Sequence, residues 1–516
     1  MKFFSVVPVL FLAVWTAAAQ TNTSAGATRA MSLQDCVQEA LAHNLDLQIQ
    51  RYNPLASLYN LKGSYGGYDP TFNFSGEHQY NNSGAEFENG QHIAGSDNNA
   101  DVFSSSFNGG TPWGMTYNLG GNVSSTKGDN SGIGRTFSTN GMIVSTNFFQ
   151  TTTPFQSSSG QIGLSLTQPL LKNFWIDSTR LNIRIGKNRL QYSEQGVRNQ
   201  IISSITAVEN AYYELIFAQE NVSVQQEALT LAQTQLDQDR QRVQIGTMAQ
   251  LDVQQDEAQV ATSRANLIAA QNTLSIDENA LKNLLTDDYA RWHDTLIQPT
   301  ATLTATLQLF DLQDSWDKGM RERPDLLQSR LNVEQQGIQL KFYNNQLYPE
   351  LDLVGSYGFN GAGQQFRDTF NQFDAADRRF YSYGAQLSMP LSNVGPRNQV
   401  KSGKVTLQQL LLQLKQLEQT VMVEIDNAVK QAQSSYQSVQ ATQQARTYAE
   451  AALDAEQKKY NVGKSTTFTV LQLQNNLTAA RSQEIRALAD YNQALANLAA
   501  EEGSTLERHK ITIEMK

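Results

Sequence analysis

The chain has 516 residues, a formal net charge of -10 and a mean hydropathy of -0.44. A length of this order predicts more than one domain. The acidic balance, without clusters of lysine and arginine, excludes nucleic acid as an expected partner, because phosphate binding needs such clusters. The single cysteine, Cys36, excludes an internal disulfide and matches no zinc-site spacing, so we expect a buried, inert thiol.

Residues 1–19 are typical of a secretory signal peptide. Lys2 supplies a positive charge, residues 3–14 are nearly all apolar, and the alanines at 17–19 fit a cleavage site before Gln20. The alternative is a membrane-anchoring helix, but the apolar run is shorter than the ~20 residues that a span needs. No later apolar run reaches that length either. The mature chain is therefore expected to be soluble or to cross a membrane as β-strands.

The chain contains a tandem duplication. Residues 32–53 match residues 311–332 without a gap, and the same register leads from Pro70 to Pro349. In a second register, Arg180, Gly186, Ala211, Gly246 and Arg264 recur as Arg397, Gly403, Ala428, Gly463 and Arg481. We assign the first repeat to residues 20–286, a linker to 287–309, the second repeat to 310–502 and a tail to 503–516. Each repeat is expected to follow the order helix, strand, loop, strand, long helix, turn, long helix.

Four segments alternate between apolar and small or polar residues with the period of two that predicts strands. They lie at about 70–80, 161–168, 349–359 and 380–389. Such strands suit an outer-membrane barrel, while a soluble β-sandwich remains an alternative because alternation alone does not separate the two. Four strands cannot close, since the smallest membrane barrels use about eight. If the strands span a membrane, three chains would supply about twelve.

The insertion between the first two strands, residues 81–160, is rich in small polar residues. Residues 81–99 and 124–138 are typical of exposed loop. Alternation of Met115, Tyr117 and Leu119 leaves a further strand or hairpin open. We expect mainly a long surface loop that extends the rim of the sheet.

Two long helical hairpins are predicted, at 182–285 and 398–501. Apolar residues recur every seventh position, the period of a left-handed coiled coil, and in the first hairpin they are Ile201, Val208, Leu215, Val222, Leu229, Leu236 and Val243, then Val253, Val260, Leu267, Leu274 and Leu281. Coiled coils alone would support a structural trimeric stalk. A tube walled by helices is the other interpretation, and the attached strand pairs favour it.

With these features the chain resembles the TolC family of outer-membrane efflux proteins. The resemblance is carried by Ser32-Leu33-Gln34-Asp35, Gln168-Pro169-Leu170-Leu171, Arg323-Pro324-Asp325-Leu326 and Val462-Gly463. It implies a mainly α chain with membrane β-structure, whose homotrimer forms a twelve-stranded β-barrel in the bacterial outer membrane and a twelve-helix α-barrel tunnel in the periplasm.

The implied function is the channel of a tripartite efflux system, a passive conduit for small molecules from the periplasm to the exterior. A periplasmic adaptor, an inner-membrane pump and outer-membrane lipid are the implied partners. The exit duct of a type I protein secretion system is the alternative within the same family. The sequence carries no catalytic constellation, no phosphate loop and no metal-ligand spacing, so we expect neither an enzyme nor a cofactor or metal site.

The candidate functional residues lie at the two helix turns. Ile245-Gly246-Thr247 and Val462-Gly463-Lys464 each place glycine where a helix stops, and the resemblance implies that these tips contact the adaptor. Asp252 and Tyr460 match positions of the family's periplasmic gate, and we expect the Asp252 carboxylate to accept a hydrogen bond from the Tyr460 hydroxyl. Thr469 and Gln472 stand where family members often carry acidic rings, a departure from the family pattern.

Overall fold

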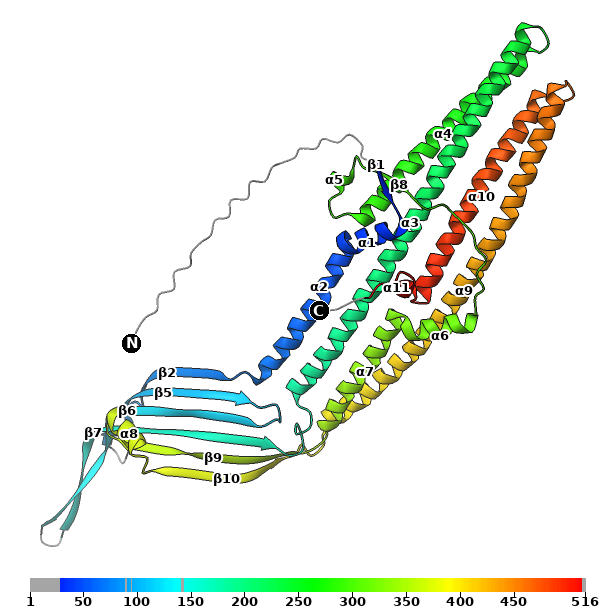
Figure 1. The fold of residues 1–516 in the computed structure, drawn as a ribbon. Helices are drawn as coiled ribbons and strands as arrows, with labels where there is room; N and C mark the ends of the chain where they lie inside the picture. The colour runs from blue at the N-terminus through cyan, green and yellow to red at the C-terminus, as the bar shows by residue number, and fades with distance from the viewer. Residues whose placement is uncertain (1–27, 89–90, 94, 141–142, 513–516) are drawn as a thin grey trace, which may run out of the picture. The chain divides into compact units, whose positions relative to one another are not determined.

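A computed structural model describes residues 28–88, 91–93, 95–140 and 143–512 (Figure 1). The expected signal peptide at 1–19 lies outside these residues. The chain divides into two compact units, each built from both repeats. The hairpin unit contains described residues 28–48, 201–312 and 426–511, and the sheet unit contains residues 49–200 and 313–425. The two longest helices, α3 (Ser178–Gln244) and α9 (Val394–Asn461), contribute residues to both units.

The sheet unit consists of an antiparallel sheet and helices that precede or follow its strands. Its strands are β2 (Thr71–Asn82), β5 (Asp97–Gly110), β6 (Thr116–Asn140), β7 (Ile143–Pro169), β9 (Glu350–Gly363) and β10 (Arg379–Ser388), with a small hairpin of β3 (Glu86–Glu88) and β4 (Gln91–Ile93). The helices are α2 (Leu45–Ser64), the 3-10 turn η1 (Tyr65–Tyr68), α6 (Leu312–Glu322), α7 (Pro324–Asn345), α8 (Phe366–Ala375) and the first parts of α3 and α9.

The main sheet has six strands in the order β10-β9-β7-β6-β5-β2 (Figure 1). The further strand or hairpin left open for residues 81–160 is present, because β5 and β6 lie within that insertion, and the expectation of mainly a long surface loop there was wrong. Phe103, Phe107 and Leu119 do alternate there, but serine, asparagine and glycine fill the positions between them. That composition is also typical of loops, and only the pairing with β2 and β7 distinguishes the two.

The six strands share one alternation of side chains. One register row across the sheet is entirely apolar and exposed, and it consists of Phe72, Phe107, Leu119, Leu164, Tyr357 and Tyr381. The neighbouring row is entirely polar, and it consists of Thr71, Asn108, Asn118, Ser165, Ser356 and Ser382. Successive residues of a strand point to opposite faces. The sheet therefore has an apolar face and a polar face along these rows.

The hairpin unit is formed by two helical hairpins. Its elements are β1 (Thr28–Met31), α1 (Leu33–His43), α4 (Gln250–Leu285), α5 (Tyr289–Trp292), β8 (Leu296–Pro299), α10 (Thr467–Glu501), α11 (Thr505–Arg508) and the last parts of α3 and α9. The heptad pattern marks the packed side of α3, because five of its seven positions are buried and Val222 and Val243 are partly buried. No described helix is both long and apolar enough to span a membrane.

The segment that links the repeats is ordered against the first helix. Strand β8 pairs in parallel with β1, and the Tyr212 hydroxyl donates a 3.0 Å hydrogen bond to the carbonyl of Met31. Cys36 is fully buried beside these strands, and burial raises the pKa of its thiol to about 12. This confirms the expectation of a buried thiol, and a thiol that keeps its proton is a poor nucleophile.

Candidate functional site

The two helical hairpins turn with the same backbone geometry. Gly246 has φ +76° and Gly463 has φ +74°, values that side chains other than glycine seldom adopt. The amide of the following residue, Thr247 or Lys464, donates a 2.9 Å hydrogen bond to a carbonyl five residues earlier. This is the Schellman arrangement that ends a helix. The duplicated glycines thus define two equivalent tips, as the sequence predicted.

The tips expose apolar as well as polar groups. Ile245 is 74% exposed and Val462 is 68% exposed, at the same position before each glycine. The side chains of Thr247 and Lys464 are exposed too. The Arg242 guanidinium donates a 3.4 Å hydrogen bond to the Asn461 side-chain oxygen, which joins the two hairpins close to their turns. All six predicted tip residues therefore lie on the surface at one end of the hairpin unit (Figure 1).

Beneath the tips lies a buried polar cluster centred on Asp239 of α3. The hydroxyl of Tyr460, on α9, donates a 2.7 Å hydrogen bond to the Asp239 carboxylate. Gln235 donates another at 2.7 Å, and Arg242 donates a third at 3.2 Å. Thr467, at the start of α10, lies 3.0 Å from the Tyr460 hydroxyl oxygen. Helices from both hairpins are therefore tied together by one carboxylate.

The expected hydrogen bond between Tyr460 and Asp252 is absent from the described residues, and the phenol donates to Asp239 instead. Asp252 lies in the first turn of α4 and is partly exposed. Its charge still acts on the cluster, because it helps to raise the pKa of Asp256 one turn further along the same helix. The partner of Tyr460 that the sequence reasoning missed is Asp239. A usable signal was present, since both repeats carry an acid seven residues before the tip glycine, Asp239 and Glu456.

Burial separates these two equivalent acids. The side chain of Asp239 is fully buried, whereas that of Glu456 is partly exposed and accepts hydrogen bonds from Lys459 and Ser465. The bonds to Lys459 and Ser465 lower the pKa of Glu456. The Tyr460 phenol is buried beside Asp239 and beneath the Arg242 guanidinium, 4.5 Å from its ring centre. Burial raises the pKa of Tyr460 to about 12, so the phenol keeps the proton that it donates.

A second buried carboxyl group faces the first. Asp256 of α4 is fully buried, and neither of its oxygens has a hydrogen-bond partner among the described groups. Burial, the nearby carboxyl group of Asp239 and the charge of Asp252 raise the pKa of Asp256 to about 7. Two adjacent buried carboxyl groups cannot both ionise without a large penalty. A proton on Asp256 removes the repulsion between the two carboxyl groups.

Other positions named from the sequence lie outside this cluster. The side chains of Thr469 and Gln472 make no described bond to Asp239, and Thr469 instead contacts Thr466 at the start of α10, 3.0 Å away. Further from the tips, the Gln259 amide donates a 2.7 Å hydrogen bond to Asn475, which again joins the two hairpins. Among the described residues, no group of histidine, cysteine and acidic side chains is arranged to hold a metal ion.

Solved channels have a similar fold. The outer membrane channel CmeC of Campylobacter jejuni aligns with a TM-score of 0.62 over 92% of this chain and 86% of that chain, at 15% identity. The outer-membrane channel OprN aligns with a TM-score of 0.64 over 92% of this chain and 90% of that chain, also at 15% identity. At such low identity the likeness shows the fold.

Sequence similarity carries the family assignment. The chain is 24% identical over 333 residues to the outer membrane efflux protein BepC of Brucella suis, covering 64% of this chain and 69% of that protein. It is 27% identical over 288 residues to the outer membrane protein TolC of Escherichia coli, covering 54% and 57%. The family described as outer membrane efflux protein matches residues 116–286 and 318–504, most of the chain. With the duplicated hairpins and the amphipathic sheet, these matches show that the chain belongs to the outer membrane efflux protein family.

Proposed function

We propose that three copies of this chain form the outer-membrane channel of a tripartite efflux system, a passive conduit for small molecules from the periplasm to the exterior. The sheet is the observation that carries the proposal. Its apolar row is exposed, and its edge strands β2 and β10 each pair on one side only among the described strands. Lipid suits the apolar face, but open edges leave backbone groups unsatisfied in lipid. Further copies of the chain satisfy both edges.

The tips are proposed to contact a periplasmic adaptor, which joins the channel to an inner-membrane pump. Two equivalent tips per chain present Ile245 and Val462 to solvent. Exposed apolar residues on a short turn are suited to binding a partner helix or loop, because contact with water is unfavourable for apolar side chains and a partner would remove it. The equal geometry of Gly246 and Gly463 supports one mode of contact at both tips.

We propose that the cluster of Asp239, Asp256 and Tyr460 holds the periplasmic gate closed. It lies just inside the tips and joins α3, α9 and α10 by hydrogen bonds, so it resists separation of the two hairpins. Asp256 of α4 adds an electrostatic contribution. A hydrogen bond to a charged partner contributes about 1.5–3 kcal/mol. Repeated in three copies, such bonds favour the closed tunnel. Asp252 then acts through its charge on Asp256.

Assembly and docking are tested separately. We expect membrane fractionation to place the chain in the outer membrane, and native mass measurement in detergent to give a trimer. A monodisperse monomer that stays in solution without detergent contradicts the channel. For docking, Ile245→Asp with Val462→Asp should abolish export while trimers remain, and the matched control Ile245→Leu with Val462→Ile should export normally. Normal export by the aspartate pair removes the adaptor contact from the tips.

A further inference from the structure

We infer that strands β5 and β6 form part of the closed wall of the trimer, so that the exit is surrounded by eighteen strands and admits bulkier solutes than twelve strands would. Three copies of a six-stranded sheet give this number. The inference rests on the proposed trimeric channel and concerns the width of its exit. It is based on the alternation of side chains in β5 and β6, on the antiparallel direction of the strands and on the width of the six-stranded sheet.

The phase of the inserted strands matches that of their neighbours. In the apolar row, Phe107 of β5 and Leu119 of β6 lie between Phe72 of β2 and Leu164 of β7. These four side chains are 39% exposed or more, at the same height in adjacent strands. A slip of one residue would turn the inserted side chains to the other face. A surface loop does not require apolar side chains on one face in register with the neighbouring strands. A barrel wall between lipid and water does require this alternation.

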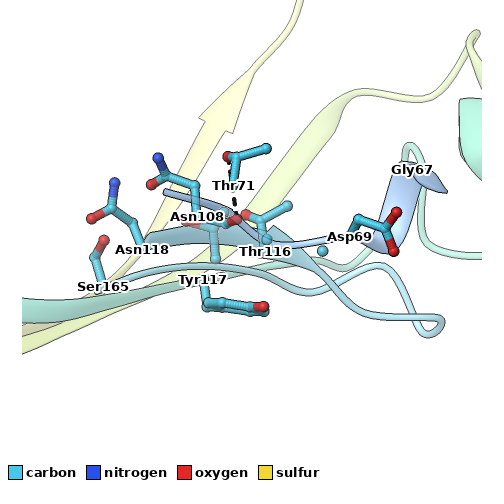
Figure 2. Close-up of a pocket in the computed structure, with 11 residues that line it drawn as sticks. Gly67, Asp69, Thr71, Asn108, Thr116, Tyr117, Asn118 and Ser165 are labelled. Atoms are coloured by element: carbon cyan, nitrogen blue, oxygen red, sulfur yellow. Dashed lines mark hydrogen bonds between the residues drawn. The ribbon is translucent and has the colours of Figure 1, made fainter. Parts of the chain in front are cut away.

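The opposite face of the same strands is polar and lines a hollow. Figure 2 shows Thr71, Asn108, Asn118 and Ser165 pointing to one side of the sheet, while Tyr117 points to the other. The hollow has a volume of about 410 Å³ and is lined mainly by glycine and small polar residues, together with Asp69 and Tyr117. Thr71 donates a hydrogen bond of 3.5 Å to the Asn108 carbonyl, from β2 to the inserted strand. Residues of this kind suit a water-filled interior.

Strand directions allow closure with six strands in each chain. Neighbours in the sheet are antiparallel throughout, from β10 at one edge to β2 at the other. An even number of strands gives the two edges opposite directions. The β2 edge of one copy can therefore pair in antiparallel fashion with the β10 edge of the next. The insertion adds two strands and so preserves this relationship, which a single extra strand would destroy.

The width of six strands also matches the helices of the same unit. Strands ~4.8 Å apart and tilted by about 40° occupy roughly 38 Å of circumference per chain for six strands and roughly 25 Å for four. Helices α2 and α7 and the first parts of α3 and α9 supply four helical segments in this unit. Four helices spaced ~9–10 Å apart also occupy roughly 38 Å. Six strands therefore continue the helical wall without narrowing it.

Disulfide trapping tests whether β5 and β6 lie within the wall. Two pairs face each other on the polar side, Asn73→Cys with Ser106→Cys and Asn118→Cys with Ser165→Cys. We expect both pairs to cross-link within one chain in outer-membrane trimers. In a four-stranded arrangement, β2 would pair with β7, and Asn73→Cys with Gly163→Cys would cross-link instead. The native Cys36 does not compete, because its thiol is buried and its pKa is about 12.

Polymer exclusion tests the width of the exit. Neutral polyethylene glycols of graded size are added on the exit side of single channels in planar bilayers, and entry is read from the fall in conductance. Deleting residues 84–152 removes β5 and β6 and connects the end of β2 directly to β7, at positions that lie level with each other in the sheet. We expect this deletion to lower the radius of the largest polymer that enters by about one third, in proportion to strand number.

The possible outcomes separate the two proposals. A monomer in native mass measurement contradicts the trimeric channel itself. A trimer in which Asn73→Cys joins Gly163→Cys, or in which the deletion leaves the size limit unchanged, overturns the eighteen-stranded wall and leaves the channel intact. If the deletion variant does not assemble, the cross-links in the full chain decide the question.

Discussion

The hydroxyl of Tyr460 donates a 2.7 Å hydrogen bond to the buried carboxylate of Asp239, and thereby joins the last turns of α9 and α3. The two residues are 221 positions apart in the chain and belong to different repeats. Asp239 also accepts hydrogen bonds from Gln235 and Arg242, which hold the carboxylate in a fixed orientation. Together with the hydrogen bond from Arg242 to Asn461, this bond links the two hairpins near their tips.

Removing the phenol should open the proposed gate. Tyr460→Phe deletes one charge-assisted bond worth about 1.5–3 kcal/mol and leaves Asp239 its two other donors. We expect the open probability, measured in single-channel recordings in planar bilayers, to rise roughly tenfold. The trimers should remain intact. Tyr448→Phe, at an exposed position of α9, is the matched control and should behave as wild type. A rise in Asp252→Ala but not in Tyr460→Phe would return the role to Asp252.

Stability should fall with rising pH because of Asp256. Its folded pKa of about 7 lies above the ordinary value of an aspartate near 4, so the folded protein binds more protons between these values. Unfolding of detergent-solubilised trimers should therefore become progressively easier from pH 4 to pH 7.

Replacing Asp256 with asparagine should remove this pH dependence, since the amide does not titrate and can still donate to Asp239. Urea unfolding at pH 5 and pH 8 is the measurement. The exposed Asp454, paired with Lys458, provides the control Asp454→Asn, which should retain the wild-type slope. The same slope in Asp256→Asn would show that another group titrates.

The tip glycines should tolerate asparagine better than leucine. Leucine at φ +76° or +74° costs about 1–2 kcal/mol and distorts the turn, while asparagine adopts this region more readily. We expect Gly246→Leu with Gly463→Leu to reduce export strongly with trimers still in the membrane, and Gly246→Asn to export nearly normally. Gly337→Leu, in open space within α7, is the control without a strained φ. Wild-type export by the double leucine variant would contradict a functional role for the turns.

Adjacent residues of one inserted strand should differ sharply in their tolerance of arginine. Leu119→Arg places a charge on the proposed lipid face and should destabilise the sheet by about 2–4 kcal/mol near the bilayer centre. Asn118→Arg points to the polar face and should assemble nearly normally. Outer-membrane yield and unfolding in lipid vesicles provide the readout. Equal loss in both variants would argue that β6 does not face lipid.

The sequence by itself determined the features that depend on local pattern. Heptad spacing placed the long helices, and the duplicated Gly246 and Gly463 placed their turns, because helix propagation and capping are decided within a few residues. The tertiary structure alone decided the partner of Tyr460, since Asp239 and Asp252 both lie near the tip and the rotation of packed helices selects between them. It also decided that Phe107 and Leu119 lie in strands, because a segment rich in serine and glycine has little strand preference until neighbouring strands pair with it.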